Sequence, residues 1–308
     1  MSFRRRPESR QILYNFKLDP DLRRGDKNAI MPELPEVETI KRNLQPDVVG
    51  KTISNIKILS PKNFIGDKKK AIGRKIVSIE RFGKVLVISL DNKKYLNVHF
   101  KLSGQMLFSK NVDRAVYKNP IPFTKGNVMP ANTTRVIVKF KDGSGLFFND
   151  LRKFGWMKLT DKPEKPKGVD VLSDDFTVGF LKRILPSKRP IKVALMDQDK
   201  LTGIGNIYAN DSLFLAKIHP LRLANSLTDL EINKLYVAIK KVILDGIKDR
   251  GSSGADEAFI LPDGSKGHHQ RHFLVYQREK QPCLACRTLV KRIKHHGRSS
   301  FFCPRCQK

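Results

Sequence analysis

The residues with the most specific chemical spacing are four cysteines close to the carboxyl end of the chain. They form two Cys-x-x-Cys pairs with 16 residues between the pairs, and the chain has no others: Cys283, Cys286, Cys303 and Cys306. Two such pairs supply four thiolates for a tetrahedral zinc ion. A redox dithiol is the alternative interpretation, but the presence of two pairs makes it the weaker one. The spacing predicts a four-cysteine zinc ribbon with one structural Zn²⁺, in a protein of a reducing compartment.

The chain as a whole is strongly basic. Its 308 residues include 60 Lys and Arg against 30 Asp and Glu, a net charge of +30. This imbalance indicates a polyanionic partner, with nucleic acid as the leading candidate. From Lys266 to Lys308 there are 11 basic residues and one acid, Glu279, so the ribbon is expected to contact DNA. No apolar run approaches the ~20 residues that span a bilayer, and we expect no membrane partner.

The elements expected to position these residues fall into two groups, which predict an α+β multidomain fold. In the first group, Val37, Ile40 and Leu44 recur at helical spacing and predict a helix over 35–45. Apolar or alternating runs of strand length follow at 53–58, 75–79, 85–90, 95–100, 105–108 and 135–140, and a turn at 142–145 leads into 146–148. These segments predict an amino-terminal β-sandwich with flanking helices over 31–160.

The second group is helical and follows an expected linker at 161–169, which is rich in proline and lysine. Helices are predicted at 176–185, 191–196 and 206–216, the first with a cap at Ser173 to Asp175. Thr228 and Glu231 predict a capping box at the start of a longer helix. We therefore expect a helical domain at 170–265, the ribbon at 266–308, and a basic extension at 1–30.

The sequence around Pro32 resembles the amino terminus of formamidopyrimidine-DNA glycosylases after methionine removal. The matching residues are Met31-Pro32-Glu33-Leu34-Pro35-Glu36-Val37-Glu38-Thr39, Lys84, 99–104, 149–155, Gly203-Ile204-Gly205-Asn206-Ile207-Tyr208-Ala209 and the zinc ribbon. The resemblance covers nearly all of 31–308. It implies a helix-two-turn-helix domain and a bifunctional glycosylase and lyase of base excision repair. The implied substrates are oxidised purines, 8-oxoguanine and formamidopyrimidines, in double-stranded damaged DNA.

Such chemistry needs an amine that attacks the sugar C1′, because the resulting iminium is the electron sink for phosphate elimination. A free α-amino group has a pKa near ~8 and is partly neutral at pH 7, unlike an exposed lysine near ~10.4. A neighbouring carboxylate can move protons to the sugar oxygen and from C2′. The resemblance thus implies Pro32 as the nucleophile and Glu33 as general acid and base. It also implies Lys84 as a sugar and phosphate contact, with Glu36 as a second acidic candidate.

A glycosylase must also extrude the damaged nucleotide and fill the gap left behind. The resemblance implies that Leu102, Arg152 and Phe154 fill this gap, with Arg152 against the orphaned base. Leu102 stands where the family usually has methionine. The remaining DNA contacts implied by the resemblance are Asn206 at a helix start, Arg298 in the ribbon, and His99. The glycine-rich stretch 252–272 is expected to be mobile and to cover the flipped base.

One feature of the sequence conflicts with this chemistry, because an internal proline is a tertiary amide without a nucleophilic lone pair. Three interpretations stay open: a start at Met31, a protease that exposes Pro32, or a catalytically silent protein that binds damaged DNA. We favour the start at Met31. An endonuclease VIII-like enzyme for oxidised pyrimidines is the enzymatic alternative, and Leu34, where that branch tends to have glycine, favours the purine branch. We expect a monomer in the bacterial cytoplasm, associated with the nucleoid.

Overall fold

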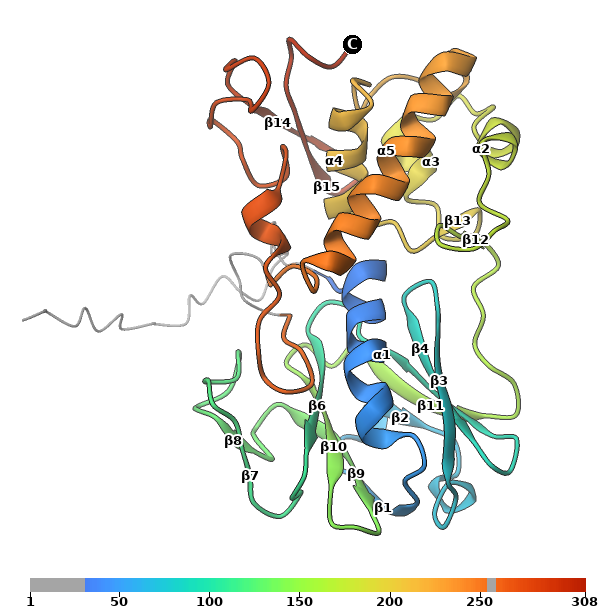
Figure 1. The fold of residues 1–308 in the computed structure, drawn as a ribbon, viewed down its shortest axis with the longest axis vertical. Helices are drawn as coiled ribbons and strands as arrows, with labels where there is room; N and C mark the ends of the chain where they lie inside the picture. Colours follow the sequence, from blue (N-terminus) through green and yellow to red (C-terminus); the bar gives the residue numbers. More distant parts are fainter. Residues whose placement is uncertain (1–30, 254–258) are drawn as a thin grey trace, which may run out of the picture.

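The computed structural model describes residues 31–253 and 259–308. The predicted basic extension at 1–30 lies outside the described residues. Within the described residues, no helix is both long and apolar enough to cross a membrane. The chain forms a β-rich half and a helical half. In Figure 1 the β-rich half is at the bottom and the helical half is at the top.

Two sheets and helix α1 (Leu34–Val48) make up the β-rich half. One sheet has the order β1-β9-β10-β6 and the other β2-β11-β5-β4-β3. In these orders the strands are β1 Ile53–Ile58, β9 Thr134–Phe140, β10 Gly145–Asp150, β6 Gly104–Ser109, and then β2 Phe64–Ile65, β11 Trp156–Thr160, β5 Tyr95–His99, β4 Val85–Leu90, β3 Ile76–Phe82. Among the described pairings within these two sheets, only the short β2–β11 pair is parallel. Apolar side chains from both sheets share one core, which confirms the predicted sandwich.

Helix α1 connects the two halves. Val37 and Ile40 pack into the sandwich core, whereas Leu34, in the first turn, packs into the separate core of the helical half. The Leu34 amide donates a hydrogen bond to the carbonyl of Gly203 at 3.1 Å. The residues at the start of α1 therefore lie where the two halves meet (Figure 1).

The helical half contains α2 Val178–Ile184, α3 Ile191–Leu195, α4 Asn206–Leu215 and α5 Asp229–Lys248. The capping box of Thr228 and Glu231 at the start of α5 is present as predicted. The predicted cap of the first helix is wrong. Thr177 caps α2 by accepting a hydrogen bond from the amide of Phe180, while Ser173 donates to the Asp170 carbonyl in a turn that precedes the helix.

Several elements were not predicted, and most of them are two-residue strands or single 3-10 turns, which carry no periodic signal. They are β7 Ala115–Val116 with β8 Val128–Met129, β12 Val169–Asp170 with β13 Leu201–Thr202, the 3-10 turns η2 Pro61–Asn63, η3 Lys68–Lys70, η4 Ala224–Ser226 and η5 His269–His272, and the ribbon hairpin β14 Lys291–His295 and β15 Arg298–Phe302. Of the stretch 252–272, residues 254–258 lie outside the described residues. In the described part, Phe259 and Leu261 are buried in the sandwich core.

Candidate functional site

The Glu33 carboxylate lies against the amino-terminal end of α4. It accepts hydrogen bonds from the backbone amides of Gly205 at 2.8 Å and Ile207 at 2.9 Å, and its side chain is buried. The first amides of a helix have no partner within the helix and carry a partial positive charge, so they favour an anion. This contact joins residues that are 172 positions apart in the chain.

Glycines in the turn before α4 make this approach possible. Gly203 has φ +104, which side chains other than glycine rarely adopt. Gly205 has an ordinary φ of −131, but a Cβ there would lie 2.4 Å from the Glu33 Oε1 atom. Any residue with a Cβ at position 205 would therefore overlap the Glu33 carboxylate, and only glycine leaves room for it.

The protonation of Glu33 is set by opposing influences. Burial is the largest effect and raises the pKa, and the charge of Glu36 also raises it. The positive charge of Lys84 and the amides of Ile207 and Tyr208 lower it. Together these influences raise the pKa from 4.5 to about 7. A carboxyl group with this pKa exchanges its proton near neutral pH. It can therefore serve as an acid in one step and as a base in the next.

Glu36 is fully engaged in holding the surrounding structure. It accepts hydrogen bonds from the Tyr208 hydroxyl at 2.7 Å, the Ser252 amide at 2.8 Å and the Glu33 amide at 2.9 Å. Burial raises its pKa, while these hydrogen bonds lower it. Glu36 thus fixes the backbone of Glu33 and connects it to α4 and to the segment after α5.

Lys84 supplies the positive charge at this junction. Its side chain is buried, and its Nζ donates to the carbonyl of Ile204 at 2.9 Å. Burial lowers its pKa, and Glu33 raises it. Pro32, which directly precedes Glu33, is buried as well. Pro32, Glu33 and Glu36, at the start of α1, and Lys84, between β3 and β4, are thus brought together at the junction of the two halves.

A second buried lysine, Lys192, was missed by the sequence analysis. Its Nζ donates to the Ser299 carbonyl at 2.7 Å and the Ser300 hydroxyl at 2.9 Å, which ties α3 to β15 of the ribbon. Burial lowers its pKa to about 7, against an opposing influence from Glu33. The only signal in the sequence was a lysine between Ile191 and Val193, which a helix surface would explain equally well.

The loop that carries Arg152 and Phe154 is held by a buried carboxylate. Asp150 accepts hydrogen bonds from the amides of Arg152 at 3.1 Å and Gly155 at 2.7 Å, and from the Ser103 hydroxyl. The Ser103 hydroxyl in turn accepts from the Arg152 amide at 2.9 Å. Phe154 is 49% exposed, and the guanidinium of Arg152 lies 5.4 Å from the centre of its ring. An exposed aromatic side chain on a fixed loop is available to a partner.

Leu102 and His99 belong to the chain segment just before Ser103. Leu102 is half-buried and comes directly before Ser103, which bonds to Asp150. The Nδ1 atom of His99 accepts from the Lys101 amide at 3.0 Å, which leaves the proton of the neutral ring on Nε2. Burial lowers the His99 pKa to about 3, assisted by nearby lysines, so the ring is neutral at physiological pH.

Asn206 and Arg298 lie on elements adjoining Glu33 and Lys84. Asn206 is the first residue of α4 and is half-buried. Arg298 begins β15 and is exposed, and its charge lowers the pKa of both Lys84 and Lys192. The ribbon therefore adds an accessible positive charge beside the buried lysines.

The four cysteines have a geometry suited to zinc. Their sulfur atoms all lie within 4.8 Å of one another, with 3.9 Å between Cys283 and Cys306 and 3.4 Å between Cys286 and Cys303. A tetrahedral ion with Zn–S bonds of about 2.3 Å places sulfur atoms about 3.8 Å apart. The donor set is complete, and the predicted structural zinc fits this site.

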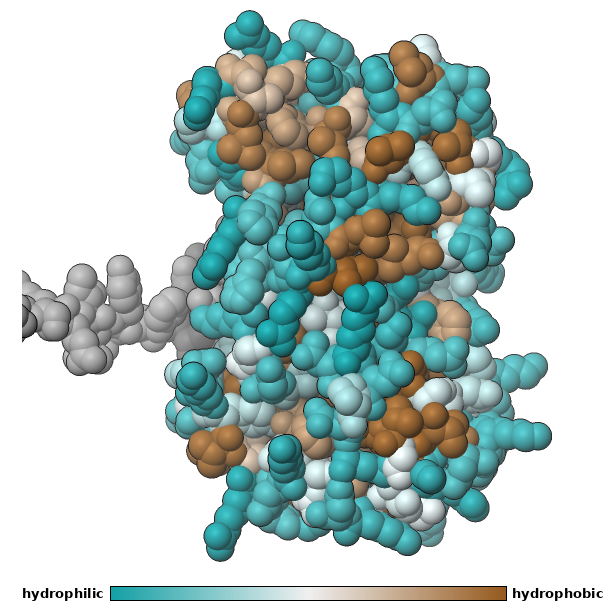
Figure 2. All heavy atoms as spheres, viewed as in Figure 1, coloured by the Kyte–Doolittle hydropathy of each residue, from teal (hydrophilic) through white to brown (hydrophobic). Residues whose placement is uncertain are grey.

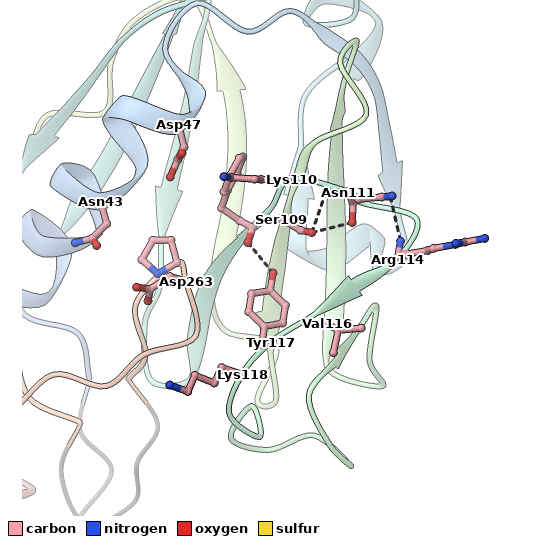
Figure 3. Close-up of a pocket in the computed structure, with 12 residues that line it drawn as sticks. Asn43, Asp47, Ser109, Lys110, Asn111, Arg114, Val116, Tyr117, Lys118 and Asp263 are labelled. Carbon is pink, nitrogen blue, oxygen red and sulfur yellow. Dashed lines mark hydrogen bonds between the residues drawn. The ribbon is translucent and has the colours of Figure 1, made fainter.

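The surface away from this junction is mainly polar in the view of Figure 2 and contains a pocket. Most of the face in Figure 2 is hydrophilic, with apolar side chains in separate patches. A pocket lies between α1, the β6–β7 connection and the loop at Pro262 and Asp263 (Figure 3). It is lined by Asn43, Asp47, Phe108, Ser109, Lys110, Asn111, Arg114, Val116, Tyr117, Lys118, Pro262 and Asp263. None of the predicted site residues lines it.

Comparison with known families matches three consecutive parts of the chain. A model for the formamidopyrimidine-DNA glycosylase N-terminal domain matches residues 31–157. A model for the H2TH domain of the same glycosylases matches 168–257, and one for a zinc finger found in FPG and IleRS matches 280–308.

Individual relatives match over nearly their full length. The formamidopyrimidine-DNA glycosylases of Pelotomaculum thermopropionicum and Chloroflexus aurantiacus are each 38% identical to this chain. Each match covers 90% of this chain, and it covers 99% of the first relative and 98% of the second. The crystal structure of MutM (Fpg) from Thermus thermophilus has a TM-score of 0.77 and 33% identity, covering 90% of this chain and 98% of that one. Lactococcus lactis Fpg in complex with abasic-site DNA has a TM-score of 0.76 and 30% identity, and the match covers 90% of this chain and 100% of that one.

The position of the Glu33 carboxylate predicts the effect of a side chain at Gly205. In Gly205→Ala the new Cβ would overlap Glu33, and we expect destabilisation of about 1–3 kcal/mol, typical of overpacking. Gly179→Ala in α2 is the matched control, since its Cβ would meet nothing closer than Thr177 Oγ1 at 3.8 Å. Thermal unfolding measures both. Equal melting temperatures for the two variants would contradict this geometry.

Proposed function

Because this chain belongs to the formamidopyrimidine-DNA glycosylase family, we propose that the Glu33 junction is where it excises damaged bases from DNA. The family makes the chain a DNA glycosylase of base excision repair, with cleavage at abasic sites as the family's second activity. Oxidised purines are the proposed substrates. Solved structures of Lactococcus lactis Fpg with Fapy-dG DNA and of MutM with carbocyclic 8-oxo-G DNA support this choice.

Pro32 is the proposed nucleophile. Its nitrogen lone pair forms a bond to the sugar C1′ as the bond from C1′ to the base breaks, and the base leaves with its electron pair and a proton. Opening of the sugar ring then gives an iminium between proline and C1′. Loss of a proton from C2′ expels the 3′ phosphate, and loss of a proton from C4′ expels the 5′ phosphate. Water then adds to the iminium carbon, which releases the remaining sugar fragment as an unsaturated aldehyde and returns Pro32 as the free amine.

Glu33 is proposed to move the protons in this sequence. It follows Pro32 directly, and its pKa near 7 allows it to give a proton to the ring oxygen and to take one from C2′. The observation that carries the proposal is this buried carboxylate on the amides of α4. Glu36 is assigned the supporting role of holding the Glu33 amide.

The surrounding cations are proposed to hold the DNA backbone. Lys84 is the proposed contact to the sugar and adjacent phosphate, with Arg298 and Asn206 as phosphate contacts on either side. The neutral His99 ring adds an Nε2–H donor beside them. Leu102, Arg152 and Phe154 are proposed to fill the gap after base extrusion, since Phe154 is exposed on a loop fixed by Asp150.

The proposed catalytic form begins at Pro32, because the iminium requires a free amine. The matching family model begins at residue 31, which supports a start at Met31 followed by removal of that methionine. The proposed organisation is a catalytic domain at 31–160, a linker at 161–169, a helix-two-turn-helix domain at 170–265 and the ribbon at 266–308. We further propose a monomer in the bacterial cytoplasm that associates with the nucleoid.

Borohydride trapping tests the identity of the nucleophile. On duplex DNA with 8-oxoguanine opposite cytosine, the chain that begins at Pro32 is expected to give a covalent adduct. The chain that retains residues 1–30 is expected to bind the same duplex without trapping, because its proline nitrogen is an amide. Equal trapping by both forms would exclude Pro32. Faster trapping on a duplex with an oxidised pyrimidine would favour the endonuclease VIII-like alternative.

The role of the Asp150 loop is tested by Phe154→Ala. Loss of an aromatic contact with bases costs about 1–3 kcal/mol, so excision of 8-oxoguanine from duplex DNA is expected to slow roughly 5- to 150-fold. Cleavage at a preformed abasic site is expected to slow less, because no base has to be extruded. Leu151→Ala, on the same loop and 41% exposed, is the matched control. If Leu151→Ala slows excision as much as Phe154→Ala, the gap-filling role is wrong.

A further inference from the structure

Three side chains outside the proposed DNA-binding site converge near the end of α5. The Oδ2 atom of Asp249 lies 2.8 Å from Nδ1 of His269 and 2.7 Å from Nδ1 of His272. The three ligand atoms lie within 4.8 Å of one another. Asp249 is the cap residue that follows α5, and both histidines belong to η5. Two separate segments thus bring their metal-binding atoms to one point.

The local backbone explains why both imidazoles reach the same carboxylate. In a 3-10 turn, residues i and i+3 lie on the same side, which places His269 and His272 above one another. The amide of His268 donates to the Asp249 carbonyl at 2.9 Å and fixes η5 against the end of α5. The three ligands are therefore held by backbone geometry in addition to their own contacts.

His269 is buried with only one of its nitrogens engaged. The side chain is 4% exposed and stacks on Tyr208, with 5.4 Å between ring centres. Its Nε2 atom has no hydrogen-bond partner among the described residues. An apolar ring would fill the same space without burying an unpaired nitrogen, which is unfavourable. The contact of Nδ1 with Asp249 is therefore what favours an imidazole at this position.

We propose that Asp249, His269 and His272 form a second zinc-binding site, separate from the four-cysteine ribbon. Two imidazoles and one carboxylate are the donors of open zinc sites, and they suit borderline divalent ions better than Mg²⁺ or Ca²⁺, which prefer oxygen ligands. The His272 side chain is 62% exposed, which gives the ion a path from solvent and leaves a coordination position for water. Widening each of the two O···N distances by a few tenths of an ångström admits the ion.

A zinc ion at this position would clamp η5 to α5 behind the catalytic junction. His269 stacks on Tyr208, and the Tyr208 hydroxyl donates to Glu36, which also accepts from the Ser252 amide. The ion would therefore hold η5, which stacks on Tyr208, against Asp249, which lies three residues before Ser252. In this way it would support both donors to Glu36 indirectly. This role is structural, because the three ligands touch none of the residues proposed to react with DNA.

Zinc stoichiometry of the full chain tests the proposal. At buffered, saturating free Zn²⁺, the wild-type protein is expected to hold two ions per chain, and His272→Ala and Asp249→Asn one each. His268→Ala is the matched control, an exposed neighbour in the same segment that should retain two ions. One ion per wild-type chain would overturn the proposal and leave the three residues as a hydrogen-bonded contact. Two ions in both ligand variants would overturn it as well.

Cobalt substitution distinguishes the two sites by their ligands. The first equivalent of Co²⁺ in the four-thiolate site is expected to give intense thiolate-to-metal charge-transfer absorption. The second equivalent should add only weak visible bands, and these should be missing in His272→Ala. A second equivalent that adds thiolate absorption in the wild type would place the extra ion on the cysteines and contradict the proposed site.

Discussion

The structure depends on burial of the Glu33 carboxylate against the first amides of α4. Burying a charge is costly unless it is paired and hydrogen-bonded, and here two backbone amides and the charge of Lys84 compensate it. Because Glu33 belongs to the β-rich half and α4 to the helical half, the contact also fixes the two halves relative to each other. The residue proposed to move protons thus also determines the assembly of its own site.

Three other buried charged side chains fix the backbone segments around Glu33. Glu36 holds the Glu33 amide, Lys84 holds the Ile204 carbonyl in the turn before α4, and Lys192 connects α3 to the ribbon. Groups fixed in this way do not need to reorganise when charge develops on a substrate. The ribbon therefore contributes to the site through position and charge, while its own zinc has a structural role.

Much of the molecule could be predicted from the sequence because its signals are local. The cysteine spacing, the capping box at Thr228 and the alternating strands each depend on a few neighbouring residues. Lys192 could not be recognised, because its role depends on β15, which lies more than one hundred positions away. The cap at Ser173 was predicted wrongly because several adjacent polar residues could serve, and Thr177 is the one whose hydroxyl accepts from the Phe180 amide. The cluster of Asp249 with two histidines also required the fold to bring it together.

The pKa of Glu33 in the DNA-free protein is the most direct test of this account. With ¹³C-labelled glutamate side chains, the Glu33 carboxyl signal is identified by its absence in Glu33→Gln and followed by NMR as pH changes. Because burial stabilises the neutral form, we predict a midpoint near 7, so that the group is mostly protonated at pH 6. A midpoint near the ordinary value of 4.5 would contradict the account, because the charge of Lys84 and the amides of α4 would then offset burial in full, and Glu33 would carry no proton to give near neutral pH.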